Sequence, residues 1–181
     1  MTIAQQLKEK NIAEFLLYMW QMEDLIRANG CDMDKLKHQV VQQMPQAQQD
    51  EAAEWLANLV EMMRVEGVKE KGHLQINRNV LQDLTELHAA LLASTKFPFY
   101  NAAYFKALPF IVELRRKNGS TDDSELETCF QALYGLLLLR LQKKEISSGT
   151  LQAMEAISHF ISLLANYYDK EQKGELKELY E

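Results

Sequence analysis

Hydrophobic residues recur along most of the chain with the spacing of an α-helix. Apolar positions step by three and four residues from Ala52 to Met63, and similar stripes run from Val80 to Leu92 and from Met154 to Tyr168. A helix with such a stripe buries one side against its neighbours. The pattern therefore predicts an all-α protein, a single-domain helical bundle of six to seven helices over residues 1–181.

Glycine, proline and capping residues mark the expected ends of these helices. Gly30 ends the first helix in a left-handed conformation, Pro45 stops the second, and Asn77 caps the fourth. Pro109 implies one kinked helix or two short ones, and Asp122 with Glu125 has the spacing of a capping box. We expect helices over about 2–29, 32–43, 50–67, 77–95, 97–118, 122–144 and 147–168, with a connection at 42–49 and a charged, loosely ordered tail at 169–181.

The composition and charge of the chain argue against a membrane-spanning or nucleic-acid-binding protein. Purely apolar runs such as Leu136 to Leu139 are far shorter than the roughly 18 residues of a membrane span. The formal charge of -6 disfavours nucleic acid, because phosphate binding uses clustered Lys and Arg. Only Arg115 to Lys117 forms a basic triplet, which at a helix C-terminus offsets the macrodipole. The first ten residues lack a secretory signal, so we expect a cytoplasmic protein with neither membrane nor nucleic-acid partner.

The first helix is apolar on two sides. Ile12, Met19 and Ile26 lie on one face of its helical wheel. The opposite face carries Leu16, Leu17 and Trp20 beside Asp24 and Arg27. Such a helix is either central in the bundle or half of an interface, and Trp is enriched at interface hot spots. Leu16, Leu17 and Trp20 are therefore the candidate interface.

Arg140 points with the stripe formed by Leu126, Leu133 and Leu137. A guanidinium in a bundle needs a carboxylate, unless its aliphatic stem carries the charge to the edge. Our hypothesis is that Arg140 pairs with Glu14 or Asp24 of the first helix. Glu14, Asp24, Arg27 and Arg140 form a candidate polar cluster, which either binds an anionic or polar small molecule or only fixes helix register.

The aromatic stretch around Pro109 is the expected place for a pocket, because proline removes a backbone hydrogen bond to the carbonyl of Phe105. Aromatic core packing is the alternative. The candidate lining consists of Tyr100, Tyr104, Phe105 and Phe110.

No residue pattern predicts a metal site, a cofactor or a catalytic residue. His88 falls within the apolar stripe of the fourth helix, where a hydrogen-bonded neutral imidazole is expected. Glu155 and His159 share a helical face as ligands do in di-metal bundles, but that face points away from the apolar stripe between Met154 and Tyr168. No arrangement of Ser, His and Asp or of Cys and His indicates a nucleophile.

Three stretches resemble a known family: 3–7 (IAQQL), 11–30 (NIAEFLLYMWQMEDLIRANG) and 125–147, which contains LYGLLLLRLQKKEIS. Together they resemble an uncharacterised family of similar-sized proteins from Bacteroidetes-type bacteria, known as a domain of unknown function. The resemblance covers essentially the whole chain. It implies a bacterial, cytoplasmic, single-domain protein and no particular activity or cofactor.

Two hypotheses follow for the function. In the first, the protein is a non-enzymatic bundle that acts through protein–protein contacts, with a protein partner or with itself as a homo-oligomer. In the second, it is a small-molecule-binding protein or enzyme with a polar pocket near Arg140 and the aromatic segment 97–110. Light scattering and an enclosed pocket at that place would discriminate between them.

Overall fold

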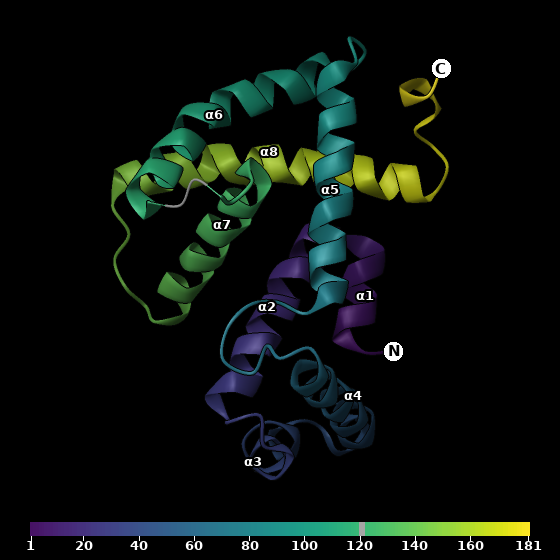
Figure 1. The fold of residues 1–181 in the computed structure, drawn as a ribbon, viewed down its shortest axis with the longest axis vertical. Coiled ribbons are helices and arrows are strands. Elements are labelled where there is room, and N and C mark those ends of the chain that lie inside the picture. The colour runs from purple at the N-terminus through teal and green to yellow at the C-terminus, as the bar shows by residue number, and fades with distance from the viewer. Residues whose placement is uncertain (120–121) are drawn as a thin grey trace. The chain divides into compact units, whose positions relative to one another are not determined.

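The computed structural model describes residues 1–119 and 122–181, and all regular structure in them is helical (Figure 1). The predicted all-α class is confirmed, and the described residues contain no strand. The elements are α1 (Ile3–Lys10), α2 (Ile12–Ala28), α3 (Met33–Gln39), η1 (Val41–Gln43), α4 (Gln46–Val65), α5 (Gln75–Ala93), α6 (Pro98–Asn118), α7 (Glu125–Leu141), α8 (Ser148–Gln172) and η2 (Lys177–Leu179).

The described residues contain eight α-helices rather than six or seven, because the segment predicted as one helix over 2–29 is two. Asn11 separates α1 from α2, and its side-chain oxygen accepts a hydrogen bond from the backbone N–H of Ala13 at 3.0 Å. An asparagine that binds the backbone two residues further on caps a new helix instead of continuing the old one.

The ends of α2 and α3 are those predicted. Gly30 has a φ of 65° after the end of α2. The carboxylate of Asp32 accepts hydrogen bonds from the N–H groups of Asp34 and Lys35, as an N-cap does. The predicted connection at 42–49 is wrong in its second half, because α4 begins at Gln46, directly after Pro45. Glutamine is a good helix former, and a proline is well tolerated at a helix start.

Three later boundaries refine the prediction. Pro109 lies inside α6, which is one helix and not two. Ser124, rather than Asp122, caps α7 and accepts a hydrogen bond from the N–H of Glu127 at 3.1 Å. Ser147 caps α8, as expected. The charged tail is docked through Leu176, which is buried at 3% exposure.

The chain divides into two compact units. Unit 1 contains residues 1–9 and 14–80, and unit 2 contains residues 10–13 and 81–181. That the two units form a single domain stays a prediction. In unit 1, α3 and η1 pack on α4. Its buried side chains include Met19, Ile26, Leu36, Leu56, Leu59 and Met63.

In unit 2, α6, α7 and α8 pack against one another, and α6 lies alongside α8 (Figure 1). The buried side chains of this unit include Leu91, Tyr100, Ala107, Ile111, Phe130, Ile157, Phe160 and Leu164. Among the described residues, no helix has both the length and the apolar character needed to cross a membrane.

Candidate functional site

Unit 1 contains a buried carboxylate that the sequence analysis missed. Glu23 on α2 is 1% exposed. Its Oε1 lies 2.7 Å from the Nδ1 of His73, and its Oε2 accepts hydrogen bonds from the backbone N–H of Leu74 at 2.6 Å and from the amide of Asn77 at 3.3 Å. Leu74 directly precedes α5, so Glu23 caps that helix from a distance, and Asn77, predicted as the cap, lies inside the helix.

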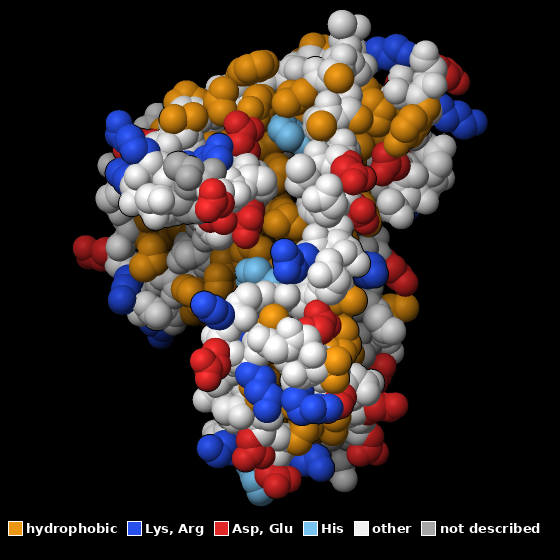
Figure 2. Space-filling model, in the orientation of Figure 1, with side chains coloured by type: hydrophobic (Ala, Val, Ile, Leu, Met, Phe, Trp, Pro, Cys, Tyr) orange, Lys and Arg blue, Asp and Glu red, His pale blue; other side chains and the backbone are white. Residues whose placement is uncertain are grey.

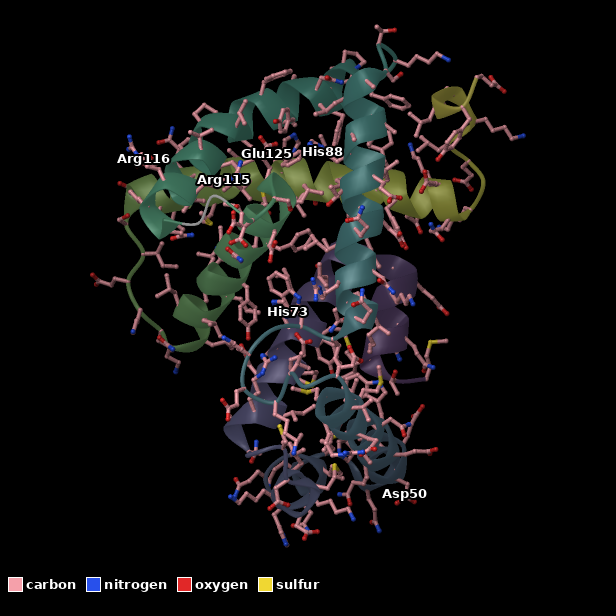
Figure 3. The ribbon with its side chains drawn as sticks, viewed as in Figure 1. Asp50, His73, His88, Arg115, Arg116 and Glu125 are labelled. Atoms are coloured by element: carbon pink, nitrogen blue, oxygen red, sulfur yellow. The ribbon has the colours of Figure 1, made fainter. Side chains whose placement is uncertain are left out.

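The segment that joins α4 to α5 is held to α2 by two further contacts. The imidazole of His73 stacks on Trp20, with ring centroids 4.3 Å apart (His73 is labelled in Figure 3). The guanidinium of Arg27 donates to the carbonyl of Val68 at 3.1 and 3.2 Å, and also to the carbonyl of Gly72. With the Glu23 bonds, these contacts make the cluster a structural clamp, because both carboxylate oxygens are bound by groups of its own chain.

Unit 2 contains a second, largely buried polar cluster, formed by His88 of α5, Tyr100 and Tyr104 of α6, and Glu125 of α7 (His88 and Glu125 are labelled in Figure 3). His88 Nδ1 and the Tyr100 hydroxyl are hydrogen-bonded at 2.6 Å, and the Tyr104 hydroxyl donates to Glu125 at 2.6 Å. The predicted hydrogen-bonded core position of His88 is therefore confirmed, at 8% exposure.

The electrostatics of this cluster oppose nucleophilic chemistry. Burial raises the pKa of the Tyr100 and Tyr104 hydroxyls and of the Cys129 thiol far above their ordinary values. Burial also lowers the pKa of His88 below 6.5, and the nearby charge of Glu125 opposes this shift. At neutral pH the two hydroxyls and the thiol therefore keep their protons and the imidazole is uncharged, so none of the four is an activated nucleophile.

The lowered pKa of His88 predicts a pH-dependent stability. The unfolded chain takes up a proton at His88 near pH 6.5 while the folded chain resists it. The free energy of unfolding should therefore hold its full value above about pH 6.5 and decrease as the pH falls below that value. Urea denaturation between about pH 5 and pH 8 measures this.

The control for this experiment is a pair of glutamine variants. His88→Gln should flatten the pH profile below about pH 6.5. His38→Gln, which changes an exposed histidine of α3, should leave the profile as it is in the wild type. If the free energy of unfolding depended on pH equally in His88→Gln and in the wild type, His88 would not be the group responsible.

The four residues of the predicted polar cluster do not share one environment. Arg27 is paired with Asp24 at 3.0 Å on α2. Glu14 is exposed at the start of α2. Arg140 is exposed in the last turn of α7, where a cation offsets the negative end of the helix dipole. Pairing of Arg140 with Glu14 or Asp24 would join the two units and stays a prediction.

The candidate interface of the first helix is covered to different degrees. Leu16 and Trp20 are 0% and 4% exposed, and Leu17 is half-buried. For Leu16 and Trp20 this is the central, buried position, which is the alternative to a partner surface.

The basic triplet lies at a helix C-terminus, as predicted. It occupies the last turn of α6 (Arg115 and Arg116 are labelled in Figure 3).

The four predicted pocket-lining aromatics lie on different sides of α6. Tyr100 and Tyr104 are buried in the polar cluster, Phe110 is half-buried, and Phe105 is 60% exposed. Tyr104 contacts Glu125 at the first turn of α7, whereas Arg140 lies 15 residues further along the same helix, about 22 Å away along its axis. Arg140 therefore lies at the far end of α7 from the Tyr104 contact, and a pocket shared by Arg140 and the aromatic segment stays a prediction.

A stripe of exposed apolar side chains runs along α6 opposite its buried side. Its members follow alternating steps of four and three residues, the spacing of a coiled-coil seam. They are Pro98, Ala102, Phe105, Pro109 and Val112, and we call them the α6 outer face. Figure 2 shows the hydrophobic side chains gathered over this helix. Phe99 flanks the stripe at 83% exposure, and Val112 is 56% exposed.

Comparison with known proteins gives a family and nothing further. No curated protein and no solved structure matches the chain. A family model described as a domain of unknown function, DUF4924, matches residues 1–175. The resemblance expected from the sequence is confirmed to that extent, and the chain belongs to the DUF4924 family.

Proposed function

We propose that this protein acts through protein–protein contact, and that it self-associates through the α6 outer face. The observation that carries the proposal is the exposed, heptad-spaced apolar stripe of that face. Exposed apolar side chains at consecutive seam positions, with Phe105 and Val112 the largest, are costly in water, and a partner helix would cover them. The candidate interface on α2 supplies less exposed apolar surface, because Leu16 and Trp20 are buried.

A second copy of the chain fits this face because the face is self-complementary in an antiparallel pair. α6 has 21 residues and is therefore about 31 Å long, which is enough for three heptads. With Pro109 at the two-fold axis, Phe105 of each copy lies opposite Val112 of the other. A two-fold interface uses the same patch on both copies, as this register does.

The charges beside the stripe support the same register. Lys106 and Glu113 are both exposed on one edge of the α6 outer face, seven residues apart. In the antiparallel pair centred on Pro109, each Lys106 lies beside Glu113 of the other copy, so two ion pairs form. Glu113 now pairs with Lys117 at 3.1 Å, and both side chains are largely in solvent, so exchanging partners costs little.

The first test is a substitution at the centre of the stripe. Phe105→Glu should shift the species from twice the 20.9 kDa chain mass to the chain mass in light scattering, and weaken self-association about thirty-fold or more. A charge placed there would be desolvated without a partner. Leu141→Glu is the matched control, because Leu141 is 58% exposed on α7, away from α6.

The second test uses the two charges. Lys106→Glu and Glu113→Lys should each weaken the dimer, and the double variant should restore it, because the charges are exchanged on both copies. A monomeric wild type at micromolar concentration would contradict self-association. A dimer that tolerates Phe105→Glu would contradict the use of the α6 outer face.

We further propose that this role is non-enzymatic and is carried out in the cytoplasm of a bacterium. The support for a non-enzymatic role is the protonated state of the Tyr104 hydroxyl in the polar cluster of unit 2 and of the buried Cys129 thiol. The support for a bacterial cytoplasm is the sequence resemblance alone, and it stays a prediction.

A further inference from the structure

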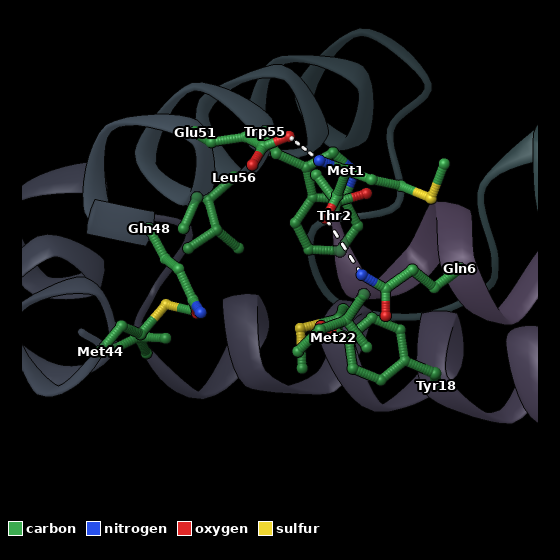
Figure 4. Close-up of a pocket in the computed structure, with 13 residues that line it drawn as sticks. Met1, Thr2, Gln6, Tyr18, Met22, Met44, Gln48, Glu51, Trp55 and Leu56 are labelled. Atoms are coloured by element: carbon green, nitrogen blue, oxygen red, sulfur yellow. Dashed lines mark hydrogen bonds and ion pairs between the residues drawn. The ribbon is translucent and has the colours of Figure 1, made fainter. Parts of the chain in front are cut away.

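We propose that unit 1 binds a small molecule with an apolar body and a cationic group, in a pocket between α1, α2, η1 and α4 (Figure 4). The pocket has a volume of about 530 Å³. Ligand sites in proteins range from about 300 to 1,000 Å³. The inference is independent of self-association, because the pocket and α6 belong to different units.

The walls of the pocket suit a flat or flexible apolar group. The rings of Tyr18 and Trp55 stack with centroids 6.1 Å apart and an angle of 20° between them. Met22 and Met44 line the pocket beside these rings, and all four side chains are half-buried. Methionine adapts its shape to a ligand, and aromatic faces attract both apolar groups and cations.

The charge of the lining selects among ligands. Glu51 is the only acidic side chain in the described lining, which contains no Lys, Arg or His side chain. Its carboxylate pairs with the amino group of Met1 at 3.2 Å (Figure 4). An ammonium group is thus already seated at this carboxylate beside two aromatic rings, and the ammonium of a ligand would take its place. The Met1 ammonium is the only cation in the described lining and is already paired with Glu51, so an anion would gain no unpaired partner there and anionic ligands are disfavoured.

Three probes with one carbon skeleton test both parts of the proposal. They are 4-phenylbutylamine, which is cationic, 4-phenylbutan-1-ol, which is neutral, and 4-phenylbutanoate, which is anionic. We expect affinity to fall in that order by calorimetry, and the amine to shift the methyl NMR signals of Met22 and Met44. Equal affinity for the three, or shifts at other methionines only, would overturn the inference.

Substitutions then locate the cationic group. Glu51→Gln should weaken binding of the amine about three- to five-fold and leave the alcohol unchanged, since Glu51 is partly solvated. Glu54→Gln, at an exposed position on the same helix, is the matched control and should change neither. Ala52→Phe should fill the pocket and abolish binding of both compounds, with circular dichroism to verify folding. An amine affinity that is unchanged in Glu51→Gln would also overturn the proposal.

Discussion

Glu23→Ala is expected to lower the free energy of unfolding by about 3–5 kcal/mol. The substitution removes the acceptor of the Leu74 N–H and of the Asn77 amide, and the partner of His73. Leu74 and Asn77 are 0% and 1% exposed, so water cannot readily replace the carboxylate. Urea denaturation followed by circular dichroism measures the loss, and hydrogen exchange at the Leu74 amide locates it.

Two comparisons make this result interpretable. Glu23→Gln keeps one acceptor oxygen and should cost less than Glu23→Ala, about 1–3 kcal/mol. Glu54→Ala, at an exposed position on α4, should remain within about 0.5 kcal/mol of the wild type. If Glu23→Ala were as stable as Glu54→Ala, or if exchange at Leu74 were unchanged, the clamp would not hold α5 to α2.

Phe160→Ala is expected to have a similar effect in unit 2, about 3–5 kcal/mol. Phe160 is 0% exposed on α8, and its ring centroid lies 5.4 to 5.6 Å from those of His88, Tyr100 and Tyr104. Removing the ring leaves a cavity among side chains that are already hydrogen-bonded in pairs. Denaturation measures the loss of stability.

A second measurement shows whether the cavity opens the polar cluster to water. The pKa of His88, followed by NMR, should rise toward 6.5 in Phe160→Ala, since burial is what lowers it. Leu151→Ala, at an exposed position on the same helix, should change neither stability nor the pKa of His88 appreciably. An unchanged pKa in Phe160→Ala would mean that the ring does not exclude water from the imidazole.

The features predicted correctly from the sequence are those fixed by local chemistry. Gly30 takes a positive φ, and Asp32 caps the next helix, because the groups involved lie within a few residues of each other. The break at Asn11 is also local, but the apolar stripe around it is continuous and concealed the cap. Hydrophobic periodicity alone does not reveal a single side chain that hydrogen-bonds to the nearby backbone.

The orientation of residues on strongly apolar helices was harder to predict. The helical spacing of Arg140 after Leu133 and Leu137 predicts a position on a core stripe, yet these leucines are only half-buried. α7 is apolar nearly all round, so the helical wheel does not define its buried side, which carries Cys129 and Phe130 instead.

The two clusters were missed for a different reason. The position of Glu23 holds one clue, since Met19 and Ile26, at four and three residues from it, are both core positions. Its partners, however, lie 50 residues or more further along the chain, beyond the reach of any spacing rule. On α6, Tyr104 is buried and Phe105 is 60% exposed, although their rings lie 5.2 Å apart and the sequence predicts one pocket for both.

The distance between Glu23 and its donors also sets an order for the folding of unit 1. His73, Leu74 and Asn77 follow Glu23 by 50, 51 and 54 residues, so their bonds close a long loop. Closing fifty residues costs on the order of 3.5 kcal/mol in chain entropy. During synthesis α2, α3 and α4 are complete before these donors exist, so the Glu23 carboxylate remains hydrated until the first turn of α5 arrives and displaces its water.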